Sequence, residues 1–381
     1  MTRLSRRDVL AAALAGAAFA TAPRALARRE PAGPSVPAAL PALARGVNLS
    51  HWFWLSRGDG YITEHDVRLL ADAKVGGEER VFTHARLPID PAFIWDGKGG
   101  AIAENLATLR RAVEVLLGAG LGVVIDPHPR DGVPWTDPNA GVFEREYGSM
   151  WKALAAELAG TDTARVAMEI MNEPHDLDRA DRWASLQKKL AAVIREHAPG
   201  HTIIATGDNW GGIDGLQRVE PLTDPNVVYS FHCYDPAIFT HQGATWGWKP
   251  WEHACGLDYP SAGAADAAGR ITDPQARAAA EAYVRDKWDG VKVRGRFGEA
   301  HAWATRHNAR VYCGEFGVHA KCTPVGGRGL WIRHAADALR ALGVGCAAWD
   351  YAGSFALASG EPGKRTLDEG LLAALAGAPA P

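Results

Sequence analysis

Long hydrophobic runs, paired cysteines and an excess of charge of either sign are all missing from this chain of 381 residues. No segment approaches 18 consecutive apolar residues, which argues against a membrane-spanning helix. The formal net charge is only −3 and the 41 basic residues are dispersed, so the basic patch that nucleic-acid binding requires is not present. Internal repeats and low-complexity modules are also lacking, which excludes repeat architectures.

Cysteine is scarce, and its spacing excludes two kinds of site. The five cysteines are Cys233, Cys255, Cys313, Cys322 and Cys346. Because no C-x-x-C pair occurs, neither a zinc ribbon nor a dithiol redox motif is indicated. We expect buried free thiols with at most one or two disulfides. Four histidines could in principle be metal ligands, namely His51, His241, His253 and His319. No H-x-x-x-H or H-E-x-x-H spacing supports them, so we predict no metal and no cofactor.

What the chain does contain is ordinary globular composition with an unusual number of tryptophans. It is 47% hydrophobic and 22% charged, which excludes a disordered or collagen-like chain. The length suits either two average domains or one large α/β barrel. Tryptophan occurs 14 times, against 10 Phe and 8 Tyr. The flat, amphipathic indole suits stacking on a ligand, although we expect most of these rings to lie in the core.

The N-terminus has the features of an export signal. Adjacent arginines at positions 6 and 7 precede an apolar run of small residues at 11–22, and Ala25-Leu26-Ala27 fits a cleavage site. The paired arginines favour twin-arginine export to the periplasm or the extracellular space, and the apolar run is short for an uncleaved anchor. The predicted organisation is a signal peptide at 1–27, a Pro/Ala-rich linker at 28–43 and the main folded domain at 44–381.

Short apolar runs alternate with longer helical patterns along the folded domain. Eight runs are candidate strands: Arg45–Ser50, Thr83–Ile89, Leu121–His128, Val166–Asn172, Thr202–Gly207, Val227–His232, Arg310–Glu315 and Gly345–Asp350. Helical periodicity is clearest at Thr63–Ala73, which has a capping-box-like start, and at Ala103–Leu117, Arg179–His197 and Arg328–Leu342. Nearly continuous apolar strands between helices indicate a parallel sheet, and a count of eight favours closure. We therefore predict an α/β fold, a single (β/α)8 TIM barrel, rather than an open doubly wound sheet.

Two segments depart from this regular alternation. Residues 74–81 exceed what a short helix–strand turn needs, so we interpret them as a small insertion. The stretch from 236 to about 272 is long, rich in Gly and Trp, and aperiodic. A long loop of this kind inside a compact domain predicts a functional role.

Two glutamates stand where predicted strands end. The segment MEIMNEP at 168–174 runs from an apolar strand into Asn172 and Glu173, and Pro174 cannot continue the ladder. The segment VYCGEFG at 311–317 ends in Glu315 between two glycines, which we expect to let a ligand come close. Because strand C-termini meet at one mouth of a barrel, the two carboxylates should face each other. Glycosidic cleavage needs such a pair: one acid protonates the leaving oxygen, and the other attacks or activates water.

With these segments the chain resembles family 5 of the glycoside hydrolases, the cellulase family of clan A, from about Arg45 to Tyr351. The resemblance implies that Glu173 is the general acid/base and Glu315 the nucleophile of a retaining β-glycosidase. The opening RGVNL at 45–49 is similar to the family's first strand. Other positions that match the family's polar and aromatic signature are Arg86, His128, Asn172, His232, Tyr234 and Trp349.

Elementary chemistry assigns roles to the residues around the two glutamates. Glu315 must be ionised to attack, so we expect the guanidinium of Arg86 and the phenol of Tyr234 to hold its pKa down. Glu173 must keep its proton near neutral pH, which partial burial and the negative charge of Glu315 would achieve. Once the glycosyl-enzyme has formed, Glu173 can act as the base for water. His232 is expected to orient Glu173.

Other residues are candidates for contact with the sugar. Asn172 is expected to bond the 2-hydroxyl, and Trp349 to form the floor on which the distorted sugar stacks. His128 is a candidate for substrate binding, with a satisfied core histidine as the alternative. Trp210 is a candidate for a neighbouring sugar platform, with core packing as the alternative. Cleft lining and loop self-packing stay equally open for Trp246, Trp248 and Trp251.

The function predicted for the catalytic domain is hydrolysis of β-linked glucan, above all as an endo-β-1,4-glucanase acting through a glycosyl-enzyme intermediate. The alternatives with the same catalytic pair are a β-1,3-glucanase, a β-mannanase or a transglycosylase. An inert carbohydrate-binding protein is disfavoured because both carboxylates and their supporting residues are present. The predicted partner is a β-glucan polysaccharide or oligosaccharide, with no nucleic acid and no stable membrane anchor, and we expect a monomer.

Overall fold

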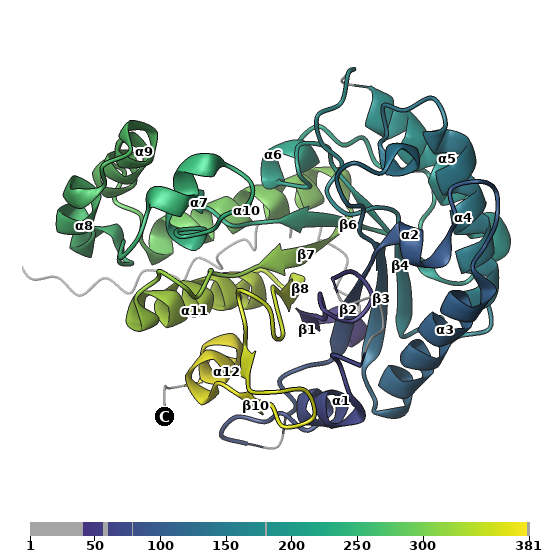
Figure 1. Cartoon of the computed structure of the whole chain (residues 1–381), viewed down its shortest axis with the longest axis horizontal. Coiled ribbons are helices and arrows are strands. Elements are labelled where there is room, and N and C mark those ends of the chain that lie inside the picture. Colours follow the sequence, from purple (N-terminus) through teal and green to yellow (C-terminus); the bar gives the residue numbers. More distant parts are fainter. Residues whose placement is uncertain (1–40, 56–59, 78, 180, 379–381) are drawn as a thin grey trace, which may run out of the picture. The chain divides into compact units, whose positions relative to one another are not determined.

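Eight parallel strands, β1 to β8, close into a barrel in sequence order, which confirms the predicted (β/α)8 fold (Figure 1). The computed structural model describes residues 41–55, 60–77, 79–179 and 181–378, so the expected signal peptide and residues 28–40 of the expected linker lie outside the described residues. The barrel strands are β1 (Arg45–Asn48), β2 (His84–Ile89), β3 (Gly122–Pro127), β4 (Val166–Glu169), β5 (Thr202–Thr206), β6 (Val227–His232), β7 (Arg310–Phe316) and β8 (Gly345–Ala348).

Helices follow the strands and cover the outside of the barrel, with α3, α4 and α5 beside β2, β3 and β4 in Figure 1. The longer helices are α1 (Glu64–Ala71), α3 (Ala103–Gly118), α4 (Phe143–Leu158), α5 (Arg182–His197), α9 (Pro274–Arg285), α10 (Gly290–His307), α11 (Val325–Ala341) and α12 (Glu369–Ala376). The shorter ones are α2 (Pro91–Ile94), α6 (Ile213–Leu216), α7 (Ala237–Thr240) and α8 (Ala265–Arg270). No helix in the described part of the chain is long and apolar enough to cross a membrane.

The strand residues divide between two cores because side chains alternate across a strand. In β3, Val123 and Ile125 face the helices, whereas Val124 points into the barrel. Leu43, which was expected to belong to the linker, joins the interior cluster from the 3-10 turn η1 (Pro41–Leu43). Above this layer, the interior positions of the strands carry polar residues. The interior cluster consists of Leu43, Val124, Ala167, Ile204, Val228, Tyr312 and Ala347.

The predicted elements occur close to where their patterns indicated. Helix α1 begins after Thr63, whose backbone N–H donates to the Asp66 carboxylate at 2.8 Å, so the capping-box-like start is confirmed. Strand β4 ends at Glu169 instead of Asn172, and β8 ends at Ala348 instead of Asp350. The strands are shorter than predicted because the chain already turns into the barrel mouth at these residues.

The two irregular segments differ from each other in what they form. In the first segment, Lys74 and Arg80 pair in an isolated antiparallel bridge. The stretch from 236 to 272 is more regular than expected, because it contains α7, α8 and two 3-10 helices, η3 (Lys249–His253) and η4 (Ser261–Gly263). Such short helices are below the length at which apolar periodicity becomes visible in a sequence. After β8, a hairpin of β9 (Ala358–Ser359) and β10 (Thr366–Leu367) leads to α12, which packs on α11.

Candidate active site

A cleft of about 1040 Å³ opens at the C-terminal ends of the barrel strands. Its volume lies at the upper end of the range for small-molecule sites, which suits a ligand of several sugar units. Of the residues predicted for the site, the cleft is lined by His128, Asn172, Glu173, Trp210, Tyr234, Glu315 and Trp349. The other two, Arg86 and His232, are buried immediately behind them. The fold therefore brings all nine predicted residues together.

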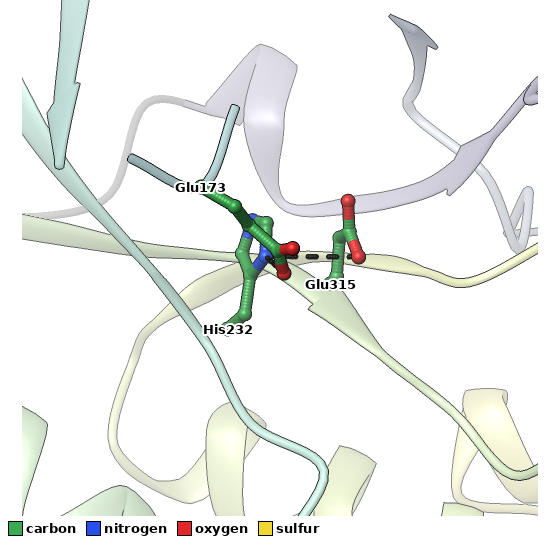
Figure 2. Close-up of side chains that lie close together, drawn as sticks. All are labelled: Glu173, His232 and Glu315. Atoms are coloured by element: carbon green, nitrogen blue, oxygen red, sulfur yellow. Dashed lines mark hydrogen bonds and ion pairs between the residues drawn. The ribbon is translucent and has the colours of Figure 1, made fainter. Parts of the chain in front are cut away.

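The two glutamates face each other across a histidine. Glu173 follows β4 in a turn with φ 40°, a left-handed conformation that is costly for a non-glycine residue and is held by its surroundings. His232, at the end of β6, places its Nδ1 2.7 Å from Glu173 and 3.6 Å from Glu315. Figure 2 shows the imidazole ring beside the Glu173 carboxyl group, with a dashed line to Glu315. One carboxylate oxygen of each glutamate and a ring nitrogen of His232 all lie within 4.8 Å of one another.

A β-bulge in β7 aims Glu315 into the mouth of the barrel. Strict alternation would place Glu315 on the same side as Cys313, which faces the helices. The register between β6 and β7 pairs Phe231 with Cys313 but His232 with Glu315, so β7 contains one extra residue at this point. Bulges re-aim side chains next to active sites. Here the bulge turns the carboxylate toward the cleft.

Arg86 connects several strands through one guanidinium group. The side chain is fully buried, and its Nη1 donates to Glu315 at 2.8 Å. Its Nε donates to Glu169 at 2.7 Å, and Nη2 lies 3.0 Å from Asp126. The same Nη2 donates to the amide oxygen of Asn172 at 2.9 Å. A planar fork of five donors suits this set, and it holds Glu315 and Asn172 in one orientation.

The second oxygen of Glu315 has its own donor. Tyr234 donates its hydroxyl to Glu315 Oε2 at 2.8 Å, while Arg86 occupies Oε1. The two predicted supporting contacts to the nucleophile candidate are therefore present. Each oxygen is held in place by one donor, so the carboxylate cannot rotate without losing a hydrogen bond.

Burial raises the pKa of Glu173 to about 7, with His128 and Arg86 acting in the opposite direction. Burial also raises the pKa of Glu315, against the lowering effects of His232 and Arg86. The expectation that Arg86 and Tyr234 would hold the pKa of Glu315 down is therefore wrong in its net direction, because desolvation outweighs these contacts. Of the two glutamates, Glu315 is the one that contacts the guanidinium of Arg86 directly, and this contact favours its ionised form. The partner of Glu173 is a neutral imidazole, since burial lowers the pKa of His232 to about 4.

His128 combines the two interpretations that were open for it. Its Nδ1 lies 2.9 Å from the Asp126 carboxylate and its Nε2 lies 3.1 Å from the amide nitrogen of Asn172. If Nδ1–H donates to Asp126, Nε2 accepts from Asn172, and burial lowers the pKa of His128 to about 4, which favours this neutral form. The ring is thus satisfied within the protein and also lines the cleft. One N–H of the Asn172 amide is left to point at a ligand.

The glycines beside Glu315 make room for protein atoms. A Cβ on Gly314 would lie 2.9 Å from Nε2 of His232, and one on Gly317 would lie 2.2 Å from the carbonyl oxygen of Trp349. The expectation that these glycines admit a ligand is therefore wrong. They allow His232 and Trp349 to approach β7 closely, which is a condition for assembling the site.

Aromatic rings line the cleft together with the two glutamates. Trp349 stacks with His128 at 5.7 Å between centroids, and both line the cleft. Trp210 is 50% exposed and lies parallel to the ring of His175, with centroids 3.4 Å apart. This exposure favours a ligand platform over core packing. Trp246 lines the cleft and is also well exposed.

The other two tryptophans of the long loop pack mainly on the loop itself. Trp251 stacks with His241 at 4.4 Å between centroids and packs against the core. Trp248 meets the edge of Trp251 at 6.3 Å and does not belong to the residues that line the cleft. The loop therefore contributes one of its three tryptophans, Trp246, to the cleft wall.

One group of side chains in the described residues has ligand atoms close enough to hold a metal ion, and it consists of Glu173, His232 and Glu315. These atoms already contact one another and the donors of Arg86 and Tyr234. A set of two carboxyl groups and a neutral imidazole also suits proton transfer. None of the four histidines considered in the sequence belongs to this group.

Several polar or aromatic residues of the site were not predicted from the sequence, and Glu169, Asp126 and Trp54 are examples. Glu169 and Asp126 both face Arg86 from the barrel interior. Their signal was strand parity: Glu169 is two residues after the interior residue Ala167, and Asp126 is two after Val124. Trp54 lines the cleft and lies 4.2 Å from His128 between centroids. It follows β1 in a loop that no local pattern placed at the mouth.

Comparisons with known proteins agree with this geometry. The model of the family described as cellulase (glycosyl hydrolase family 5) matches residues 71–354. Cellodextrinase A of Ruminococcus flavefaciens is 29% identical over 289 residues, which cover 72% of this chain and 76% of that protein. Endoglucanase C of Acetivibrio thermocellus is 26% identical over 321 residues, which cover 80% of this chain and 90% of that protein.

Solved structures share the fold at lower identity. Cel5A of Thermotoga maritima in complex with cellobiose superposes with a TM-score of 0.70 at 22% identity, covering 88% of this chain and 97% of that one. The same protein in complex with mannotriose also gives a TM-score of 0.70. At this identity the likeness concerns the barrel architecture.

Proposed function

The chain belongs to the cellulase family, glycosyl hydrolase family 5, and from this premise we propose that it is a retaining endo-β-1,4-glucanase with Glu173 as general acid/base and Glu315 as nucleophile. The observation that carries the proposal is the pair of carboxyl groups at the ends of β4 and β7, with oxygens within 4.8 Å in a cleft of about 1040 Å³. Retaining enzymes hold their carboxyl groups about 5–5.5 Å apart, whereas inverting enzymes need about 6.5–9.5 Å to admit water.

The first step uses the two glutamates in opposite protonation states. A carboxylate oxygen of Glu315 bonds to the anomeric carbon while the bond from that carbon to the leaving oxygen breaks. Glu173 gives its proton to the leaving oxygen, which departs as a sugar hydroxyl. The raised pKa of Glu173, about 7, keeps this proton available at neutral pH. Arg86 and Tyr234 hold the attacking carboxylate in place.

The second step reverses the roles. With Glu315 esterified, its negative charge is gone, and the ionised Glu173 accepts a proton from water. The water oxygen bonds to the anomeric carbon, the ester bond breaks, and Glu315 leaves as a carboxylate. Two displacements at one carbon give a product that keeps the β-configuration. His232 orients Glu173 in both steps, at 2.7 Å from its carboxylate.

Sugar-binding residues support a polymeric β-glucan as substrate. Trp349 lines the same cleft as the glutamates and forms the floor of the reacting position, and Asn172 presents an amide N–H for the 2-hydroxyl. Trp210 and Trp246 extend the aromatic surface along the cleft. Glucose rings present apolar faces to such indoles, so a chain of several residues gains contact at each one. This arrangement supports cleavage within a chain.

Azide rescue of two alanine variants tests the roles. Glu173→Ala should lose turnover of substrates with poor leaving groups, yet still be glycosylated by an activated aryl cellobioside, and azide should release a β-glycosyl azide. Glu315→Ala should be inactive toward both substrates, and azide should give an α-glycosyl azide. Glu146→Ala is the matched control, because Glu146 is a buried glutamate that bonds Trp95 outside the cleft. Swapped azide anomers would show that the roles are reversed.

β-Mannan is the second candidate substrate. The observation that favours it is the mannotriose complex of Thermotoga maritima Cel5A, which has the same fold. Initial rates on a panel of β-1,4-glucan, β-1,3-glucan and β-mannan, with NMR detection of the first anomer formed, distinguish the candidates. A preference for mannan or β-1,3-glucan would replace the proposed substrate, an excess of coupled products would indicate a transglycosylase, and an α-anomer formed first would exclude retention.

We also propose that the enzyme is exported by the twin-arginine route. Supporting features are the arginines at positions 6 and 7, the apolar run at 11–22 and the small residues up to Ala27. The mature chain would then begin at residue 28 and act as a monomer in the periplasm or outside the cell. Polysaccharide substrates occur in these compartments.

A further inference from the structure

Two of the five cysteines meet at the base of the loop that carries Trp246. The loop leaves and rejoins the barrel rim at Gln242 and Leu257, where the buried Gln242 side chain donates to the Leu257 carbonyl at 2.9 Å and accepts from its N–H at 2.8 Å. Cys255 stands two residues before Leu257. Cys322 belongs to a different segment, which follows β7 and therefore Glu315.

The backbone and side chains of the two segments place these thiols side by side. The Sγ of Cys255 lies 3.9 Å from the carbonyl oxygen of Cys322, and the N–H of Gly256 donates to the same oxygen at 3.0 Å. The thiol of Cys322 is turned toward the loop, because a Cβ added to Gly243 would lie 2.7 Å from its Sγ. The two thiols also contact each other through a side-chain hydrogen bond, and a disulfide requires this proximity.

We propose that Cys255 and Cys322 form a disulfide that ties the Trp246 loop to the segment after β7, while the other three cysteines remain thiols. This inference goes beyond the proposed function and does not depend on it. Both partners can be reached by an oxidant in the folded protein, since Cys255 is exposed and Cys322 is partly exposed. The remaining three, Cys233, Cys313 and Cys346, are buried.

The bond forms by thiol–disulfide exchange with a disulfide oxidant such as oxidised glutathione. The thiolate of Cys255 attacks one oxidant sulfur and releases the first glutathione thiol, and Cys322 then attacks the Cys255 sulfur and releases the second. Two electrons and two protons thus pass from the pair to the oxidant. We assign the first attack to Cys255 because its side chain is the more exposed of the two. Cys322 is the weaker candidate, because burial and the neighbouring Cys255 thiol raise its pKa to about 11. Once Cys255 is a mixed disulfide, its thiol no longer raises the pKa of Cys322.

The bond closes a long loop of the chain, so its effect on stability should be measurable. Disulfides restrict the unfolded state more when the cross-linked residues are far apart in sequence. The path from Cys255 to Cys322 includes α8, α9, α10 and β7. For a domain of this size we expect oxidation to raise the Tm by about 3–6 °C.

The first test counts thiols in the full chain. Protein purified under reducing conditions is incubated with oxidised glutathione, denatured, alkylated and weighed, and its non-reduced peptides are mapped. The expected result is three alkylated thiols and one linked peptide pair containing Cys255 and Cys322. Cys255→Ser should show four alkylated thiols and no linked peptides. The control Cys346→Ala should show two alkylated thiols and the linked pair of Cys255 and Cys322. Five alkylated thiols, a stable glutathione adduct on Cys255 or a covalent dimer would overturn the proposal.

Thermal unfolding provides the second test. The oxidised wild type should unfold at a higher temperature than the reduced wild type, whereas Cys255→Ser should unfold at the same temperature in both conditions. This comparison within each variant cancels any cost of the substitution itself. An equal Tm for oxidised and reduced wild type would show that the cysteines do not tie the loop.

Discussion

Replacing Arg86 by lysine separates the charge of this residue from its geometry. The guanidinium contacts three carboxylates, with N–O distances of 2.8 Å to Glu315, 2.7 Å to Glu169 and 3.0 Å to Asp126. Lysine keeps the charge but offers one nitrogen in place of the planar fork, so it cannot serve all three. Glu169 and Asp126 lie deeper in the barrel and will hold the ammonium. Glu315 should therefore lose its direct contact with a cation.

The size of the effect follows from the lost contact. Two unit charges about 4 Å apart interact by about 4 kcal/mol at an effective dielectric constant of 20. One pKa unit corresponds to about 1.4 kcal/mol, so complete loss of the charge would raise the pKa of Glu315 by at most about 3 units. Because the ammonium remains nearby, we expect a rise of about 1–2 units. Fewer molecules are then ionised at low pH, so the acid limb of the kcat/KM profile moves to higher pH.

The assay uses an aryl β-cellobioside with a good leaving group, because departure of the aryl group needs little help from Glu173. The acid limb of the kcat/KM profile for this substrate then reports the ionisation of Glu315. Arg365→Lys is the matched control, since Arg365 is also buried and pairs with Asp66 at 3.1 Å beside α1. Both variants lose a buried guanidinium, but only Arg86→Lys should shift the profile. An unchanged acid limb in folded Arg86→Lys, or an equal shift in Arg365→Lys, would refute the reasoning.

Two further predictions concern substrate binding and export. Trp210→Ala should lower kcat/KM for cellohexaose about five- to tenfold, because it removes an exposed stacking surface. The Tm of this variant should be almost unchanged. An unaltered kcat/KM, measured by initial rates, would show that this ring does not bind substrate. Expression in a host with a twin-arginine pathway should give an exported chain whose mass corresponds to a start at residue 28. When the arginines at positions 6 and 7 are replaced by lysines, the precursor should stay inside the cell. An exported chain of full length would contradict the predicted cleavage.

The barrel and the facing pair of glutamates were predictable because they depend on local patterns and on one rule of topology. Apolar runs of strand length alternate with helical periodicity, and parallel strands all end at the same mouth. Once Glu173 and Glu315 stand at strand ends, their meeting follows without knowledge of any contact. Arg86, His232 and Tyr234 were identified by the resemblance to the family and not by this rule.

Features that depend on contacts between distant segments were not predictable. Strict alternation would have turned Glu315 toward the helices, and only the bulge in β7 brings it into the mouth. The role of Gly317 depends on the carbonyl of Trp349, which lies on the neighbouring strand end. Cys255 and Cys322 have no spacing that marks them as a pair. Their proximity results from two loops that follow different strands.

The sequence by itself determined the number of strands, their direction and the identity of the groups at their ends, because strand and helix periodicity are properties of consecutive residues. The tertiary structure decided the ionisation of those groups. Burial raises the pKa of Glu315 although Arg86 and His232 oppose it, and that balance depends on how completely the barrel excludes water from the carboxylate. Desolvation and charge contacts are sums over neighbours from many strands, so no local pattern contains them.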